Sequence, residues 1–150
     1  MAQLTQRTNQ FNSSAIRLNE LEIKKIIKDN KKLVYQCSAE DKFGDYGIIG
    51  LAIFEFKEKT AIVSSFLMSC RALGREIENY FFEYLVNEAR KLKIKQLFIL
   101  FKKNSKNDLV YEFLKKNCKK YKKRNHFMHY EVDILNRKNK NKLIKIIDEN

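Results

Sequence analysis

The stretch TAIVSSFLMSCRALGREIENYFFEYLVNEARKL, residues 60–92, decides the fold of this chain. Residues 61–68 are apolar apart from two serines, which is typical of a central strand covered on both faces. A basic loop with one glycine follows, and then a helix. Strand, glycine loop and helix in this order present helix N-terminal amides to a phosphate. The apolar residues of the helix recur at steps of three and four, and we expect these to be buried: Ile77, Tyr80, Phe81, Tyr84, Leu85, Ala89 and Leu92.

The residues before this stretch predict a helix and further strands. Asn19 precedes apolar positions at helical spacing, so we expect a capped helix over residues 20–28. Residues 33–39 and 46–56 have the apolar content of strands and are joined by a turn with Asp and Gly. Strands joined by short turns form an antiparallel meander that leads into the central strand. Residues 15–18 predict one more short strand.

The residues after it predict a parallel crossover. Residues 97–101 form a second apolar strand, which a strand, helix, strand order places parallel to the central strand. Two parallel neighbours that diverge at their carboxyl ends leave room for a ligand. Residues 121–133 alternate as an edge or hairpin strand, and residues 134–150 predict a basic C-terminal helix. A helix over residues 107–117 should turn four apolar residues inward: Leu109, Val110, Phe113 and Leu114.

Composition limits the class of protein. A single domain over residues 1–150 fits this length. The three cysteines lie far apart with no Cys-x-x-Cys pair, which argues against a disulfide framework or a zinc ribbon and fits a reducing cytoplasm. No apolar run approaches the roughly 20 residues of a membrane span. His126 and His129 would point to opposite faces of a strand, so we expect no metal site.

The net charge of +13 is unevenly distributed. Residues 1–89 hold 12 basic and 12 acidic side chains, whereas residues 90–150 hold 19 basic and 6 acidic ones. Such an excess attracts polyanions, although an AT-rich genome also produces Lys and Asn in abundance. Residues 115–124 contain one aromatic residue and no recognition-helix pattern, so nucleic-acid binding would be nonspecific and sensitive to salt.

Three segments carry a resemblance to a known family. AQLTQRTNQFN at 2–12, KFGDYGIIG at 42–50 and SFLMSCRALGRE at 65–76 resemble, in order, motifs in the C-terminal portion of FkbH-like proteins. The order of elements also resembles the GNAT acyltransferase fold, an α/β fold with a mixed central sheet. In FkbH-like proteins a haloacid-dehalogenase-like domain precedes this portion and loads a glyceryl group onto an acyl carrier protein for polyketide biosynthesis. Its aspartate motif is absent here, so residues 1–12 look like a linker from such an upstream domain.

The resemblance implies a site for acetyl-CoA, another acyl-CoA or phosphopantetheine. The edge of the central strand would pair with the pantetheine amides, and the loop amides would surround the pyrophosphate. Arg71 and Arg75 would add charge-assisted contacts. The implied binding residues are Leu67, Met68, Ser69, Cys70, Arg71, Ala72, Leu73, Gly74, Arg75, Glu76 and Asn107.

Glu76 departs from the loop pattern (Q/R)-x-x-G-x-(G/A), whose last residue is small. A carboxylate is favourable at a helix N-terminus without ligand, but it would repel a pyrophosphate. A capped helix that binds no ligand is therefore the alternative interpretation of this loop. Asp45 and Tyr46 could face an acceptor or simply form the hairpin turn.

The sequence identifies the catalytic residues less clearly than the binding residues. The family's catalytic Tyr position falls on Leu114, one turn after Tyr111, which either substitutes for it or is an interior aromatic. Cys70, beside Arg71 before the helix, is either a reactive thiol or an inert buried one. No carboxylate is marked as a general base, which favours a binding role over full catalysis. We therefore expect a GNAT-like domain that recognises CoA or an acidic acyl carrier protein, with a free-standing CoA-dependent acyltransferase as the alternative.

Overall fold

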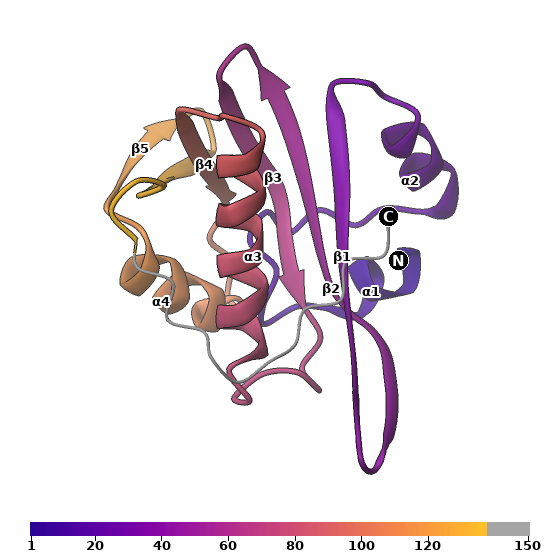
Figure 1. Cartoon of the computed structure of the whole chain (residues 1–150). Coiled ribbons are helices and arrows are strands. Elements are labelled where there is room, and N and C mark those ends of the chain that lie inside the picture. The colour runs from indigo at the N-terminus through magenta and orange to yellow at the C-terminus, as the bar shows by residue number, and fades with distance from the viewer. Residues whose placement is uncertain (138–150) are drawn as a thin grey trace.

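A computed structural model describes residues 1–137 of the chain. Its centre is one six-stranded sheet in the order β1-β2-β3-β4-β6-β5, flanked by helices (Figure 1). Only β3 and β4 run parallel, so the predicted mixed α/β sheet is confirmed. The strands are β1 (Lys32–Asp41), β2 (Gly44–Lys57), β3 (Thr60–Met68), β4 (Gln96–Phe101), β5 (Lys120–Arg124) and β6 (Phe127–Val132). The helices are α1 (Ala2–Arg7), α2 (Glu20–Ile27), α3 (Ile77–Lys91) and α4 (Asp108–Asn117).

The meander β1-β2-β3 forms as the sequence predicts. Ala52 pairs with Phe66 and Phe56 with Ala61 in the antiparallel register of β2 and β3. Nearly every residue of β3 is buried, since the strand lies inside the sheet, and α3 lies over it in Figure 1. β1 and β2 extend past the other strands as a long hairpin, which projects from the molecule in Figure 1.

Helix α3 covers one face of the sheet, but its buried side differs from the prediction. Phe82 and Val86 are buried, whereas Leu92 is 44% exposed and Tyr80 is only partly buried. The reason is α4, which lies on the same face. The Phe82 and Phe113 rings meet edge to face with centroids 5.4 Å apart, so the buried stripe of α3 is turned toward α4.

Helix α2 packs on another part of the sheet, with its own small core. Leu18, Ile23 and Ile53 form this cluster, separate from the main core. The predicted cap is confirmed: the Asn19 side chain accepts from the Glu22 N–H at 2.9 Å, and Glu22 accepts from the Asn19 N–H at 2.7 Å. This capping box fixes where the helix begins.

Two predictions about the later elements need correction. In α4, Val110 and Leu114 are buried as expected, but Leu109 is 51% exposed because it faces a surface pocket instead of the core. Residues 121–133 form the hairpin β5-β6. Residues 134–136 form a turn instead of the start of a helix, and the rest of the predicted C-terminal helix lies outside the described residues.

The N-terminal residues are part of the packed fold, contrary to the expectation of a linker. Thr5 is buried in α1, and its hydroxyl donates to the Leu18 carbonyl at 2.9 Å. Phe11 is 2% exposed and belongs to the main core. Residues 15–18 do not form the predicted strand, because the chain turns at Ala15, whose φ of 57° is left-handed. No helix within residues 1–137 is long and apolar enough to cross a membrane.

Candidate functional site

The loop between β3 and α3 stands at the carboxyl end of the parallel pair. It is built from turns: the Ala72 N–H donates to the Ser69 carbonyl at 2.9 Å, and the Leu73 N–H to the Cys70 carbonyl at 3.4 Å. Ala72 is buried and Leu73 partly buried, which anchors the middle of the loop. The exposed members are Cys70, Arg71, Gly74, Arg75 and Glu76.

Two residues of the loop have left-handed backbones. Gly74 has φ 77°, and a Cβ added there would meet nothing within 4 Å, so its conformation and not its space requires glycine. Glu76 has φ 66° and is the N-cap of α3, without a capping hydrogen bond from its side chain. Its carboxylate accepts from the Asn79 side chain at 3.2 Å. The small residue of the related loop pattern would fit this backbone better than glutamate does.

A cluster of three side chains ties this loop to the β1-β2 hairpin. The Tyr46 hydroxyl donates to Asp41 at 2.8 Å, and Arg75 Nη1 lies 3.0 Å from that hydroxyl and 3.4 Å from the carboxylate. We call Asp41, Tyr46 and Arg75 the hairpin clasp. The Phe43 N–H and then the Tyr46 hydroxyl lower the pKa of Asp41, with Arg75 contributing less. Arg75 is therefore already engaged, whereas no hydrogen bond or ion pair to another described residue engages the Arg71 side chain.

The N-terminal segment lies against the edge of β3 that the loop follows. The parallel pairing of β3 with β4 ends at Val63 opposite Ile99, and β3 continues for five more residues. Residues 11–13, which we call the crossing segment, fill this place. The Met68 N–H donates to the Phe11 carbonyl at 2.9 Å, and the Ser13 N–H to the Phe66 carbonyl at 3.0 Å.

The crossing segment also reaches β4 and α4. The Lys102 N–H donates to the Ser13 carbonyl at 2.8 Å, and the Ser13 Oγ accepts from the Phe66 N–H at 3.0 Å. Asn107, fully buried before α4, donates to the Asn12 carbonyl at 3.3 Å and to the Lys102 carbonyl at 2.9 Å. In Figure 1 the indigo chain leaves α1, crosses the sheet and returns to α2. Asn107 thus positions the crossing segment.

Of the predicted strand-edge residues, Leu67 and Met68 are fully buried in β3. The Ser69 N–H donates to the Ile49 carbonyl at 2.7 Å, and the Met68 N–H is taken by Phe11, so these two donors are already satisfied within the chain. Cys70 is exposed, and its Sγ lies 3.9 Å from the Gln10 side-chain oxygen. The expectation that Cys70 could be buried is therefore wrong.

Tyr111 lies on α4, packed against the end of β4. Its ring stacks on Phe101 with centroids 5.4 Å apart, and the Lys103 and Lys115 ammonium groups lie 4.5 Å and 5.2 Å from its centre. No hydrogen bond or ring contact joins Tyr111 to Cys70 among the described residues. The structure therefore brings together the loop, the hairpin and the N-terminal motif, but it does not join the two candidate catalytic side chains.

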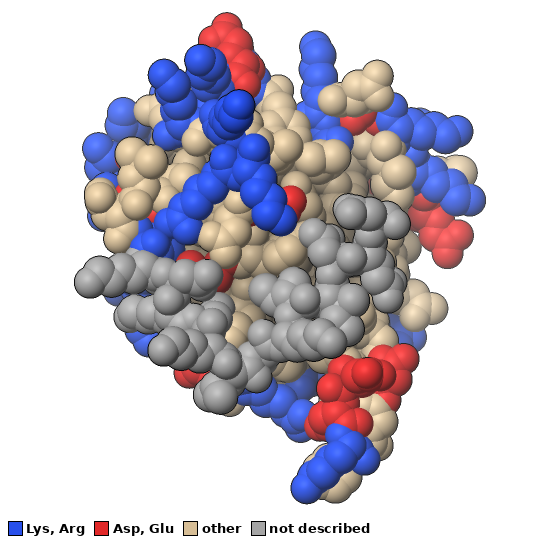
Figure 2. All heavy atoms as spheres, viewed as in Figure 1, with Lys and Arg blue, Asp and Glu red and all other residues tan. Residues whose placement is uncertain are grey.

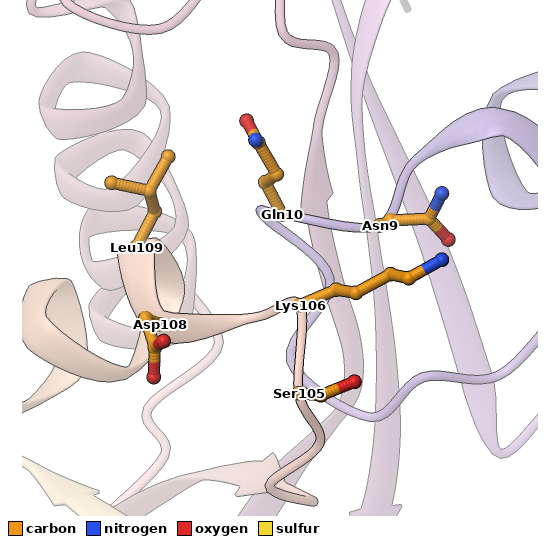
Figure 3. Close-up of a pocket in the computed structure, with 6 residues that line it drawn as sticks. All are labelled: Asn9, Gln10, Ser105, Lys106, Asp108 and Leu109. Carbon is orange, nitrogen blue, oxygen red and sulfur yellow. The ribbon is translucent and has the colours of Figure 1, made fainter.

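A polar surface pocket opens beside the crossing segment. It has a volume of about 460 Å³, and its lining comes from the N-terminal motif, the loop before α4 and the first turn of α4, with Lys106 extending toward Asn9 (Figure 3). Its lining residues are Asn9, Gln10, Ser105, Lys106, Asp108 and Leu109. Within residues 1–137 no group of three His, Cys, Asp or Glu side chains is placed to hold a metal ion.

Sequence reasoning missed the crossing segment and the hairpin clasp. Phe11, a single aromatic residue within the polar run QRTNQFNSS at residues 6–14, was the available signal of a buried N-terminus. No local pattern indicates that Asp41 pairs with Arg75, because Arg75 lies 34 residues later in the chain.

No family model matches the chain, and no curated protein matches it in sequence. Solved structures do match in three dimensions. The ribosomal-protein-S18-alanine N-acetyltransferase from Escherichia coli is similar with TM-score 0.62 and 14% identity, over 95% of this chain and 90% of that one. The chain has the GNAT fold. A GNAT family acetyltransferase from Elizabethkingia anophelis, solved with acetyl-CoA bound, is similar with TM-score 0.54 and 11% identity, over 77% and 83%.

The PaiA N-acetyltransferase from Thermoplasma acidophilum, solved with coenzyme A, has TM-score 0.52 and 10% identity to this GNAT-fold chain, over 66% of it and 60% of that one. At these identities the likeness concerns the fold. The GNAT architecture predicted from the order of elements is therefore confirmed, and the binding residues stay predictions.

Proposed function

We propose that this GNAT-fold chain is an acyltransferase domain that binds the phosphate end of CoA, or of a phosphopantetheine thioester, at residues 69–76. The observation that carries the proposal is the exposed loop at the head of α3, where Gly74 turns the backbone at φ 77° and the Arg71 side chain is exposed. Amides before a helix and a nearby guanidinium are the groups that bind phosphate. GNAT-fold neighbours that hold acetyl-CoA or coenzyme A support the same ligand.

The residues present fit the two ends of such a ligand unequally. The loop amides and Arg71 suit the phosphates, and Arg75 would add charge from its place in the hairpin clasp. Glu76 opposes them, because its carboxylate lies at the first turn of α3. The edge of β3 does not suit the pantetheine arm as folded, since the crossing segment occupies it. We therefore derive no acyl-transfer step along this edge.

Cys70 and Tyr111 are the proposed reactive side chains. Cys70 is exposed at the end of β3 and donates toward Gln10, which would orient its thiol at the surface of the loop. Tyr111 is held by Phe101 and two lysines near the start of α4. If either group takes part in transfer, Cys70→Ser or Tyr111→Phe should lower turnover while CoA binding persists.

The hypothesis that this domain recognises an acyl carrier protein has support of its own. The three segments that resemble FkbH-like motifs meet at one end of the sheet: Gln10 contacts Cys70, and Tyr46 contacts Arg75. Lys and Arg side chains gather where β5 lies (Figure 2), and all five β5 residues are exposed. An acidic acyl carrier protein, delivering a glyceryl or acyl group in polyketide-type biosynthesis, would complement this charge. An upstream haloacid-dehalogenase-like domain would belong to the same role.

Calorimetry with CoA and acetyl-CoA tests the proposal. We expect micromolar binding that Arg71→Ala weakens about tenfold or more, because a charge-assisted contact to phosphate is lost. Arg124→Ala, which removes an exposed charge on β5, is the matched control and should leave CoA binding unchanged. Absence of binding by the wild-type chain would contradict the proposal.

A further inference from the structure

The edge of β3 beyond Val63 is the place where an extended ligand would join the sheet. β4 no longer pairs with β3 there, so the backbone groups of that edge need another partner. The structure supplies that partner from the chain itself. We infer that the crossing segment, residues 11–13, occupies the position of an extended thioester arm, and that an arm pairs with β3 only after this segment leaves.

The hydrogen bonds explain why the two occupants exclude each other. The crossing segment takes the Phe66 N–H, the Phe66 carbonyl and the Met68 N–H. A pantetheine arm carries two amides, which offer the donors and acceptors of a short peptide strand. One edge of a strand pairs with one partner, as in β-strand addition. The crossing segment is therefore an internal competitor for the arm.

The crossing segment is held firmly. Phe11 is 2% exposed, and its ring meets those of Phe66 and Phe113 edge to face with centroids 5.5 Å and 5.2 Å apart. Asn12 and Ser13 are also buried. Without ligand, the state in which the crossing segment has left β3 is thus a small fraction of the population. The apparent affinity for an arm is reduced by that fraction. The loop at residues 69–76 remains exposed for the phosphate end.

This inference rests on the proposed function, and it makes a distinct prediction about ligand pieces. CoA contains the arm, whereas 3′-phospho-ADP contains only the nucleotide and its phosphates. If the arm gains no contact in the resting chain, both ligands bind the wild-type protein within about threefold of each other. An open edge would instead make CoA the much tighter ligand.

Two neighbouring buried serines give a matched pair of variants. Ser13 Oγ accepts the Phe66 N–H at 3.0 Å, whereas Ser14 Oγ has no hydrogen-bond partner among the described residues. Ser13→Ala should loosen the crossing segment and tighten CoA binding about tenfold, with no change for 3′-phospho-ADP. Ser14→Ala should change neither. Phe11→Leu keeps an apolar side chain but loses the ring contacts, and it should give the same binding pattern as Ser13→Ala. It replaces Ser13→Ala in this test if Ser13→Ala folds poorly.

Amide hydrogen exchange supplies a readout that does not depend on affinity. The Phe66 and Met68 amides should exchange faster in Ser13→Ala than in Ser14→Ala, and saturating CoA should protect them again in Ser13→Ala. CoA binding at least tenfold tighter than 3′-phospho-ADP in the wild type, unchanged in Ser13→Ala, would overturn the inference and leave the proposed function standing. No binding of either ligand by any of these proteins would overturn both.

Discussion

The Cys70 Sγ lies 3.9 Å from the Gln10 side-chain oxygen, although 60 residues separate them in the chain. Each belongs to a motif that was visible in the sequence, and neither motif indicates the other. The contact exists because the crossing segment runs along the end of β3, directly before the loop that contains Cys70. The N-terminal motif is therefore part of the candidate site and not only a covering of the core.

The environments of the three cysteines predict one fast-reacting thiol. Burial raises the pKa of Cys118 to about 12, against a smaller lowering effect of Arg137, and burial also raises the pKa of Cys37. Cys70 is exposed. Because the thiolate is the reactive form, we expect one thiol to label rapidly with an aromatic disulfide reagent in the folded protein.

Cys70→Ser should abolish the rapid phase of that labelling, and Cys118→Ser should leave it intact. Gln10→Ala should leave Cys70 at least as accessible, because it removes a neighbouring side chain. A rapid phase that survives Cys70→Ser would show that Cys37 or Cys118, both only partly exposed, also reacts readily, contrary to this prediction.

Replacing Glu76 should both stabilise the chain and favour an anionic ligand. Its φ of 66° strains a side chain with a Cβ, so Glu76→Gly should add about 1 kcal/mol to the free energy of unfolding. That gain corresponds to a rise in Tm of about 2–4 °C for a chain of this size. Calorimetric melting measures the first effect, and CoA titration measures the second.

Glu76→Gln separates the two contributions. It keeps the strained backbone and removes the charge, so it should tighten CoA binding without the gain in Tm. Glu78→Gln, one residue into α3, is the control for a general loss of negative charge. Equal CoA affinities in the wild type, Glu76→Gln and Glu76→Gly would show that the carboxylate does not approach the ligand.

The hairpin clasp predicts a loop that loosens in acid. The pKa of Asp41 is lowered in the folded state, chiefly by the Phe43 N–H and the Tyr46 hydroxyl. Its stabilising effect is thus present above the unfolded carboxyl pKa and is lost as the pH falls through the lower, folded value. Acidification should therefore free Arg75 and raise hydrogen exchange in residues 69–76.

Asp41→Asn should show that looser loop already at neutral pH, with little further change on acidification. Asp45→Asn is the matched control, because Asp45 accepts from the Gly47 N–H and does not contact Arg75. A carboxyl NMR titration of Asp41 checks the direction of the pKa shift. Identical exchange profiles for Asp41→Asn and the wild type would mean that the clasp does not restrain the loop.

Most of the fold could be predicted because its elements carry strong local patterns. The alternation of apolar and polar residues and the apolar runs located β1 to β4, and the Asn19 cap located α2. The buried face of α3 was harder, since it depends on α4, which contacts it through Phe82 and Phe113. Helical period alone does not say from which side a neighbour packs.

The crossing segment could not be predicted from local pattern. Asn12 and Ser13 are polar but buried: local backbone groups satisfy the Asn12 side chain, whereas the Ser13 hydroxyl pairs with Phe66, 53 residues later. A polar residue normally indicates an exposed position, which is why residues 1–12 look like a linker in the sequence. The sequence predicts a loop between residues 68 and 77, and the structure has one there, whereas the occupant of the neighbouring strand edge appears only in three dimensions.

Gly50 is expected to be the least replaceable glycine, because it lies where β2 faces the end of β3. A Cβ added there would lie 2.7 Å from Met68 Sδ, 3.0 Å from Cys37 Cβ and 3.1 Å from Phe81 Cδ1. Met68 is fully buried and has little room to move. Gly50→Ala should therefore lower the free energy of unfolding by about 1–3 kcal/mol, measured as a lower urea midpoint at unchanged slope.

The control and the double variant identify the cause of that loss. Gly47→Ala meets no atom within 4 Å but forces a Cβ onto φ 62°, so its cost of about 1 kcal/mol comes from the backbone alone. Met68→Ala removes the sulfur that crowds Gly50, so Gly50→Ala should cost less in that background than in the wild type. Strictly additive losses would mean that Met68 is not what excludes a side chain at this position, and that the backbone of β2 there sets the requirement for glycine.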